Sequence, residues 1–580
     1  MRKVLLSSML AAIAALVVAG TATATMEGHE VTKVNFYAGC PIGGPGVLYP
    51  DTEPEPWVAR NPANPDNFIG AWQQDRWDNG GARGLTAGYS FNDGHFWQDV
   101  PLPFSKCAAP YYSPQPCPVG VGSPTPCTLL YDRASDAWLD IGPDGKAYTV
   151  SISFNANDNN NAVGAAVSAD GGVSWGLGTE IIHDVDADPL EPFNDKEAVT
   201  ADPTLPNTAY VVWDRLSLVS CGPSGRSHQD PESEDRPWRG AKKLAPKGAE
   251  PSRPSTAGAE TPPEQLLCFE GPANFSATFN GGLTWSPPRP IVENAPDEQT
   301  IGNQIVVDPN TGRLYDFYLY INNKGDAFIE DVFSDDKGLT WSPRQTVDKL
   351  GSVGIRDPQT GAPARTGDIL PEPAIDPRTG QLYVVWQDAR FNNNGEDDVV
   401  ISTSPPRAGT TGSWTPPQKV NLPEDRAGFT PAIKVNGLGQ VGVDYYSLRH
   451  PDLGPDVWPV ERYLRISSGP AAIAAGPQGP SATFDFNQPT HVAGPFNMLM
   501  APFARGFFTG DYEGMAVDRH DMSFHTFFAQ SNCDTTNCAP AAINVSDSGF
   551  PPGAETSVSH PPDPFDVYTN NYFKLGSPLR

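Results

Sequence analysis

The chain has 580 residues, of which 62 are proline and 56 are glycine, about a fifth of the total. This share stays short of low-complexity sequences, yet it would interrupt helices repeatedly, so a disordered chain, a collagen and a mostly helical protein are excluded. Acidic residues outnumber basic ones by 68 to 39, and the resulting net charge of −29 would repel phosphate backbones, which excludes nucleic acid as an expected partner.

The first 24 residues have the pattern of a secretory signal peptide. Arg2 and Lys3 precede an apolar run from Met9 to Val18, and residues 22–24 (ATA) supply the small-residue cleavage signature. The run is too short to span a membrane, and no later segment approaches the roughly 20 apolar residues that a spanning helix needs. We therefore expect an exported protein, extracellular or periplasmic, with no membrane span.

Eight cysteines in an exported chain predict disulfides rather than metal ligands. Cys533 and Cys538 would close a small loop, and Cys221 and Cys268 bracket a segment dense in proline, glycine and charge. The four others have three possible pairings: Cys40, Cys107, Cys117 and Cys127. Zinc-ligand spacing is absent from the sequence, so no metal site is expected from the cysteines.

A short strand, a turn and an aromatic-rich strand recur along the chain. Five clear copies pair residues 57–60 with 68–72, 138–141 with 147–150, 198–201 with 209–213, 305–307 with 313–315, and 373–375 with 382–386. Two weaker copies pair residues 432–434 with 440–443, and 514–517 with 524–527. This spacing predicts an all-β fold, a single β-propeller of seven four-stranded blades, or six if a weak copy is an insertion. The propeller would span residues 57–580, and residues 25–56 would close the ring through a strand at 34–37.

A second repeat reads S/T-x-D/N-x-G-x-x-W. Its four copies are residues 90–97, 168–175, 278–285 and 334–341, with a degenerate fifth at Ser413-Trp414. The Asp or Asn caps its own backbone in a tight turn, the glycine permits a positive φ, and the tryptophan packs the turn onto the sheet. We expect these turns to join the third and fourth strands of a blade on one face, the bottom face, and to be purely structural.

This pattern resembles the Asp-box, or BNR repeat, of the sialidase superfamily and related β-propellers, over about residues 57–415. In sialidases three arginines bind the substrate carboxylate, a glutamate activates a tyrosine nucleophile, and an aspartate acts as the acid. The family's Arg-Ile-Pro motif is absent from the corresponding residues 57–62 (WVARNP), and Arg76 is the best single match to a family arginine.

The opposite face, the top face, would carry the links that lead into each blade and the insertions at 104–137 and 216–270. Loops on a rigid scaffold usually carry function. Carboxylates recur in these links, and the catalytic candidates are Tyr512, Glu513, Asp511, Glu197, Asp195 and Glu372. The candidates for substrate binding are Arg76, Arg215, Arg390 and Lys196. The arginines also fit a second interpretation, ion pairs between blades.

We expect a monomeric, exo-acting glycoside hydrolase for an acidic glycan or glycoprotein, because a carboxyl pair can protonate the leaving oxygen and attack or activate water. One alternative is a non-catalytic propeller that binds glycan or protein. Another is a polysaccharide lyase, with His183, His450 or His520 as base. No cofactor is expected; calcium in the oxygen-rich loops 155–158 and 392–398 is the alternative to ordinary polar turns.

Overall fold

The computed structural model describes residues 29–112, 129–185, 192–220, 267–406, 413–449, 457–477, 479–518, 522–532 and 565–572. Several predicted features lie outside this part: the signal peptide, Cys117, Cys127, Cys221, Cys533, Cys538, His450, His520, residues 113–128 of the first insertion and residues 221–266 of the second. None of the helices in these ranges has the length and apolar character needed to cross a membrane.

The described residues form an all-β fold, as predicted, with one four-residue α-helix, α1 (Ala109–Tyr112), and the short 3₁₀ turns η1 (Lys106–Ala108), η2 (Ala389–Phe391) and η3 (Met498–Met500). Most strands belong to antiparallel units of four. Unit 1 consists of β3 (Trp57–Arg60), β4 (Phe68–Trp77), β5 (Ala82–Ser90) and β6 (Gln98–Pro101). Unit 2 consists of β7 (Arg133–Ile141), β8 (Ala147–Phe154), β9 (Asn161–Ser168) and β10 (Thr179–Asp184). Unit 3 consists of β11 (Phe193–Ala201), β12 (Ala209–Ser220), β14 (Ala273–Thr278) and β15 (Arg289–Val292). Unit 4 consists of β16 (Glu298–Val307), β17 (Leu314–Ile321), β18 (Ala327–Ser334) and β19 (Gln345–Lys349).

The later units follow the same order. Unit 5 consists of β22 (Glu372–Ile375), β23 (Leu382–Asp388), β24 (Asp398–Ser404) and β25 (Gln418–Lys419). Unit 6 consists of β26 (Ala427–Val435), β27 (Val441–Leu448), β28 (Pro459–Ile466) and β31 (Thr490–Asn497). Unit 7 is β33 (Gly514–Val517), β34 (Phe524–Ser531), β35 (Phe565–Tyr572) and the N-terminal β1 (His29–Glu30). The predicted strand pairs form the first two strands of these units. The second strands begin within one residue of the prediction, whereas β7, β11, β16 and β26 begin five to seven residues before the predicted start.

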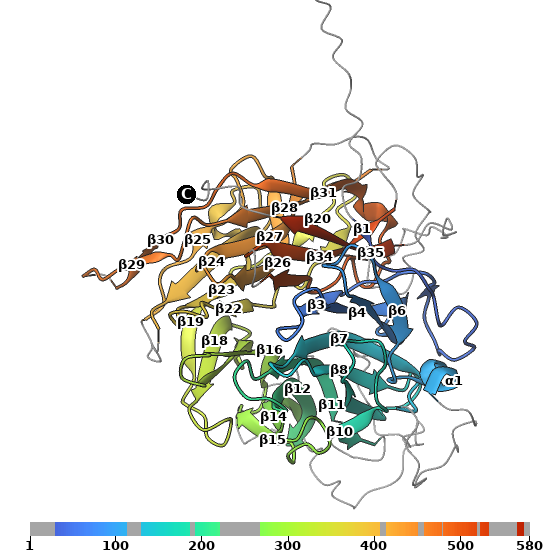
Figure 1. The fold of residues 1–580 in the computed structure, drawn as a ribbon. Helices are drawn as coiled ribbons and strands as arrows, with labels where there is room; N and C mark the ends of the chain where they lie inside the picture. The colour runs from blue at the N-terminus through green and yellow to red at the C-terminus, as the bar shows by residue number, and fades with distance from the viewer. Residues whose placement is uncertain are drawn as a thin grey trace, which may run out of the picture.

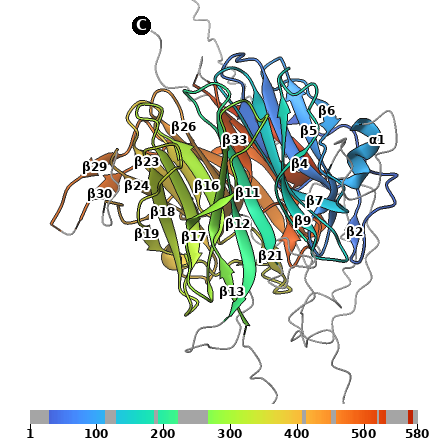
Figure 2. The ribbon, with the colours of Figure 1, turned by 90° about the horizontal axis from the view of Figure 1, so that it is seen from below.

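The remaining strands are additions to the units: β2 (Leu48–Tyr49) pairs with β4, and β13 (Leu267–Gly271) pairs with β12 and β16. A separate small sheet contains β20 (Ile355–Arg356), β21 (Pro363–Arg365) and β32 (Phe507–Phe508). The hairpin of β29 (Ala472–Ala474) and β30 (Ser481–Thr483) projects from the body in both views (Figures 1 and 2).

The units are arranged around a common centre. Their first strands contact one another in cyclic order, β3 with β7, β7 with β11, β11 with β16, β16 with β22, β22 with β26, β26 with β33, and β33 again with β3. Figure 1 shows the consequence: the blue N-terminal strands lie beside the red C-terminal ones. Figure 2 shows the same units turned by 90°.

The chain ends meet in unit 7, where His29 and Glu30 of β1 pair with Thr569 and Tyr568 of β35. The predicted closing strand at residues 34–37 is therefore wrong in position: these residues form no strand, and Asn35 Oδ1 accepts a hydrogen bond from Tyr37 N at the start of a turn. A disulfide joins Cys40 to Cys107 across a Cα–Cα distance of 5.6 Å, which selects one of the three pairings for Cys40. Cys268 is also disulfide-bonded.

All four repeat turns join the third strand of a unit to the fourth, as predicted. In each, the first hydroxyl accepts a hydrogen bond from the glycine amide four residues later, at 3.1, 3.0, 2.9 and 2.8 Å for Ser90, Ser168, Thr278 and Ser334. The Asp or Asn side chain accepts a second backbone amide at 2.8–3.0 Å. The hydroxyl, the Asp or Asn and the glycine of the repeat thus hold each turn together, and the indole N–H of Trp97 and Trp341 also donates to the glycine oxygen.

Candidate active site

The seven first strands present equivalent residues toward the centre. Their last pairs with the second strand are at Arg60, Ile141, Ala201, Val307, Ile375, Val435 and Val517. The third residue before each of these is, in order, Trp57, Trp138, Ala198, Gln304, Glu372, Ala432 and Gly514. We call these seven residues the axial layer. Small residues at three of the positions leave room for the two tryptophans, whose rings stack with centroids 3.6 Å apart.

The backbone is irregular two residues earlier in five of these strands. The φ angles are 58° at Glu55, 56° at Asp136, 49° at Lys196, 72° at Gly302 and 42° at Thr430. A positive φ costs a residue with a side chain of order 1–3 kcal/mol, and for a β-branched residue such as Thr430 it is a genuine outlier. The ladder register shifts beside Asp136, Lys196, Gly302 and Thr430. Beside these irregular positions, charged side chains from different units meet: Lys196 contacts Glu55 and Asp136.

A continuous set of contacts crosses the axial layer. Glu372 lies 3.6 Å from Lys434 Nζ, and that ammonium group lies 4.8 Å from the centroid of the Trp57 ring. Trp57 stacks on Trp138, whose centroid lies 4.9 Å from that of Tyr512. Lys196 Nζ lies 5.8 Å from the Tyr512 centroid and 2.7 Å from Asp511 Oδ2. We call the set the axial cluster, and its members are Glu372, Lys434, Trp57, Trp138, Tyr512, Lys196, Asp511 and Arg365.

Asp511 is the anionic end of the axial cluster. Arg365 Nε donates to Asp511 Oδ1 at 2.9 Å, and Arg365 Nη2 donates to the other oxygen. Burial would raise the pKa of the Asp511 carboxyl, but the charges of Arg365 and Lys196 outweigh it and hold that pKa well below its ordinary value. Glu55 and Asp136 also approach Lys196 Nζ, at 3.4 and 3.7 Å. Asp511 is consequently ionised at every physiological pH.

Glu372 lies at the other end of the axial cluster, and the pKa of its carboxyl is shifted upward, in the direction opposite to that of Asp511. Burial raises the pKa of Glu372 from 4.5 to about 7, although the charge of Lys434 counteracts it. Glu197 is buried as well, and burial, reinforced by the charge of Asp195, raises its pKa well above the ordinary value. Glu372 therefore carries a proton over part of the neutral range while Asp511 does not.

The structure brings together four of the ten predicted residues in the axial cluster: Tyr512, Asp511, Glu372 and Lys196. Asp195 and Glu197 flank Lys196 on β11, and the Asp195 carboxylate accepts the Lys196 amide at 3.0 Å. Arg76 is fully buried near the cluster, where it donates to Gln73 Oε1 at 2.7 Å. Arg76 and Arg365 both stack on the Phe508 ring, at 4.9 and 4.4 Å from its centroid.

Three predicted residues lie elsewhere. Glu513 accepts a hydrogen bond from Tyr446 Oη at 2.7 Å, within a separate buried group between units 6 and 7. Arg215 pairs with Asp184 on the last strand of unit 2, at 2.6 Å. Arg390 pairs with Asp388 at 2.7 Å and with Asp348 on the last strand of unit 4, at 2.8 Å. For Arg215 and Arg390 the interpretation as ion pairs between neighbouring units describes the geometry.

Some residues of the calcium and lyase alternatives lie in the described part of the chain, and each makes contacts within the protein. Asn155 Nδ2 donates to Asp158 at 3.0 Å, and Asp397 accepts Ser352 Oγ at 2.6 Å and Val353 N at 2.8 Å. His183 Nδ1 lies 3.1 Å from Glu180 Oε2 on β10, with both side chains well exposed.

Sequence reasoning missed Trp57, Trp138, Lys434 and Arg365 as site residues. In the sequence both tryptophans stand out only as strand residues. An alignment of the seven first strands on their last ladder pair gives Trp57 and Trp138 equivalent positions. Arg365 belongs to β21, which is outside the repeated units, so no repeat could have indicated it.

The sequence matches no protein-family model and no curated protein. Among solved structures, the chain is similar to an α-L-arabinanase of Penicillium chrysogenum in complex with arabinobiose, with a TM-score of 0.39 and 12% identity over 73% of this chain and 94% of that one. It is also similar to the intramolecular trans-sialidase of Ruminococcus gnavus (TM-score 0.38, 12% identity, 76% and 94% covered). A leech intramolecular trans-sialidase has a TM-score of 0.37 at 12% identity, with 87% and 83% covered.

Proposed function

We propose that the chain is an exported, seven-bladed β-propeller of the Asp-box type and that it hydrolyses glycosidic bonds at the axial cluster. The cyclic contacts of the seven first strands support the blade number, and the four hydroxyl–glycine turns support the Asp-box assignment. The signal-peptide pattern supports export.

The observation that carries the proposed activity is the pair of carboxyls with oppositely shifted pKa values in one set of contacts. Opposite shifts assign acid and base roles in sites that use two carboxyls. Glu372, with a pKa of about 7, would donate its proton to the leaving glycosidic oxygen. Asp511 stays ionised next to Tyr512 in the chain, and two routes are open. Water attacks the anomeric carbon directly and loses its proton to solvent, or Tyr512 attacks it and loses its proton to solvent. In the second route water then breaks the glycosyl–Tyr512 bond, and the Glu372 carboxylate takes the proton of that water while the Tyr512 oxygen is protonated from solvent.

The charge balance of the cluster favours a neutral sugar over an acidic one. Two cations, Lys196 and Arg365, face three anions, Asp511, Glu55 and Asp136. A substrate carboxylate would have to displace Asp511 from both cations, which costs more than the new contacts would return. Trp57 and Trp138 instead provide an apolar aromatic wall of the kind that packs on sugar rings.

One observation favours a second function, a non-catalytic glycan-binding propeller. The charged groups of the cluster already pair with one another, and Lys196, Asp511, Glu372 and Tyr512 are all buried. Such satisfied networks often rigidify a core.

The test is mass-spectrometric detection of products after incubating the protein with neutral, sialylated and uronate-containing glycans. We expect release of a neutral sugar, and a loss of about a hundredfold or more in turnover for Tyr512→Phe. The control Arg313→Gln removes a surface pair with Asp335 and should keep full turnover. Affinity for a glycan with no product from any member would establish the binding function instead, and release of sialate or uronate would overturn the substrate class.

A further inference from the structure

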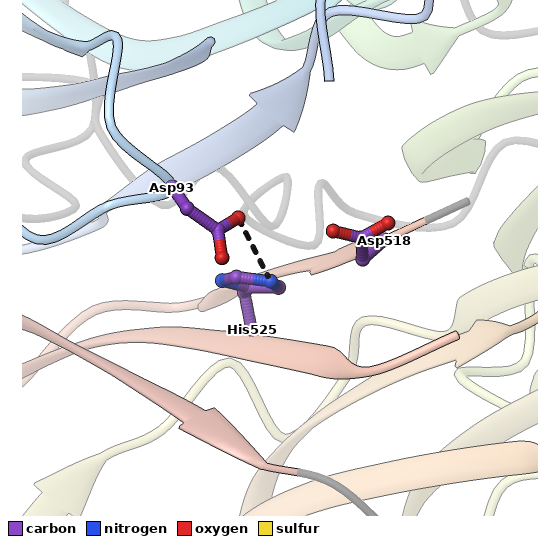
Figure 3. A group of neighbouring side chains, drawn as sticks. All are labelled: Asp93, Asp518 and His525. Carbon is purple, nitrogen blue, oxygen red and sulfur yellow. Dashed lines mark ion pairs between the residues drawn. The ribbon is translucent and has the colours of Figure 1, made fainter. Parts of the chain in front are cut away.

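A second cluster of metal-ligating side chains lies on the bottom face, where the first unit meets the last. It consists of Asp93, Asp518 and His525 (Figure 3). Asp93 belongs to the turn between β5 and β6, Asp518 follows β33, and His525 is the second residue of β34. One ligand atom from each residue lies within 4.8 Å of the other two. Three segments that are far apart in sequence thus converge on one point.

The imidazole of His525 is held in place by its surroundings. Its ring is buried and packs on Phe68, with centroids 4.4 Å apart. Nε2 lies 3.2 Å from Ser523 Oγ and 3.9 Å from Asp93 Oδ1, and Figure 3 shows the Asp93 carboxylate approaching the ring while Asp518 lies beside it. A positioned imidazole of this kind is what a metal site needs.

The same point already attracts positive charge. Arg60, at the end of β3, forms an ion pair with Asp518 through Nη1, and its Nη2 lies 3.9 Å from Asp93 Oδ1. Arg60 is itself held by a hydrogen bond from Nε to Pro65 O. Two carboxylates and one guanidinium leave a net negative charge at this point, so the electrostatics favour a further cation.

We propose that Asp93, Asp518 and His525 bind one zinc ion. One imidazole nitrogen with two carboxylate oxygens suits zinc, whereas calcium and magnesium take oxygen ligands alone. Three protein ligands leave a fourth tetrahedral position for water or for His95, which is exposed and lies two residues after Asp93 in the same turn. Asp93 is partly exposed, which gives the ion a way in from solvent.

The zinc ion would close the ring. Asp93 belongs to unit 1, and Asp518 and His525 belong to unit 7, so the ion would add to the contacts of β3 with β33 and to the pairing of β1 with β35. An ion that binds the folded ring and not the unfolded chain stabilises the ring by an amount that grows with the logarithm of the ratio of its concentration to its Kd.

The test uses the full chain, freed of metal by chelator and dialysis, and zinc chloride as the probe. Isothermal titration should show one site, and zinc at about a hundred times its Kd should raise the Tm by about 3 °C. Asp93→Asn, in a partly exposed turn where folding is not at risk, should weaken zinc binding at least tenfold, and His525→Gln should abolish it. The matched control is His491→Gln, because His491 also faces a carboxylate, Glu461 at 3.6 Å, and lacks a third ligand. It should bind zinc as the wild type does.

The variant Arg60→Gln distinguishes a metal site from a pair of carboxylates that is already neutralised by the Arg60 guanidinium. If zinc and the guanidinium share the carboxylates, removing Arg60 should strengthen zinc binding severalfold. Zinc binding by Arg60→Gln but not by the wild type would show that the guanidinium already fills the site and would overturn the proposal. Equal zinc affinity of the wild type and Asp93→Asn, or no binding by any variant, would overturn it as well.

Discussion

The axial cluster and the ion pairs between neighbouring units contain the same kinds of residue in very different surroundings. At the axis, the side chains of Lys196 and Asp511 are 3% and 0% exposed. At the unit boundaries, those of Arg390 and Asp348 are 32% and 25% exposed. From the sequence we expect both groups on the same face of the propeller, and the sequence carries no signal that separates them by burial.

The comparison shows that burial decides how a charged side chain contributes to stability and how far its pKa shifts in this fold. A solvent-exposed pair contributes about 0–1 kcal/mol because water and salt screen it. A buried charge that loses its partner is costly, and its pKa shifts instead of being screened. Burial therefore shifts the pKa values of Glu372 and Asp511 in the axial cluster, and it does so for other buried carboxyls such as Asp214 as well.

We expect Asp511→Asn to have the largest effect on the free energy of unfolding. It removes the anion that Arg365 and Lys196 share and leaves two buried cations with fewer partners, so the free energy of unfolding should fall by about 3 kcal/mol. Urea denaturation measures this change, with Asp335→Asn, a mutation at a largely exposed pair, as the control. A loss equal to that of the control would mean that the axial charges are as well solvated as the surface ones.

Glu372→Gln should change how stability depends on pH. Because burial raises the pKa of Glu372 from 4.5 to about 7, the folded protein retains a proton there that the unfolded chain loses. The stability that this group contributes is complete below about pH 4.5 and is lost as the pH rises through 7. The variant, which stays neutral, should gain up to about 3 kcal/mol over the wild type between pH 4.5 and pH 8. Parallel pH–stability curves for the two proteins would contradict the raised pKa.

Arg215→Gln and Arg390→Gln should have the smallest effects. Each removes a partly exposed guanidinium, and its buried partner, Asp184 or Asp388, keeps a hydrogen bond from another side chain. The expected loss is therefore below about 1 kcal/mol and decreases further in 1 M salt. Thermal denaturation at low and high salt measures both. A loss of several kcal/mol in either variant would place these arginines with the axial charges.

Most of the fold follows from local patterns that a sequence displays. Alternating apolar strands and the serine–glycine turns depend on neighbouring residues, and so the strand pairs and the four turns were predicted correctly. The closing strand was misplaced because β1 has only two residues, too few for a pattern. The Lys196–Asp511 contact spans 315 residues and depends on a backbone bulge at Lys196, and neither feature leaves a local signal.

The most direct test of the account is the pH dependence of kcat/KM for the wild type and Glu372→Gln on the glycan that yields product, with Arg313→Gln as the control. The account predicts that wild-type activity falls as the pH rises through about 7, where Glu372 loses its proton. Glu372→Gln should lose about a hundredfold or more in kcat/KM and, with no carboxyl at this position, lose that limb as well. Full activity of Glu372→Gln with an unchanged pH profile would contradict the assignment of the axial cluster as the catalytic site.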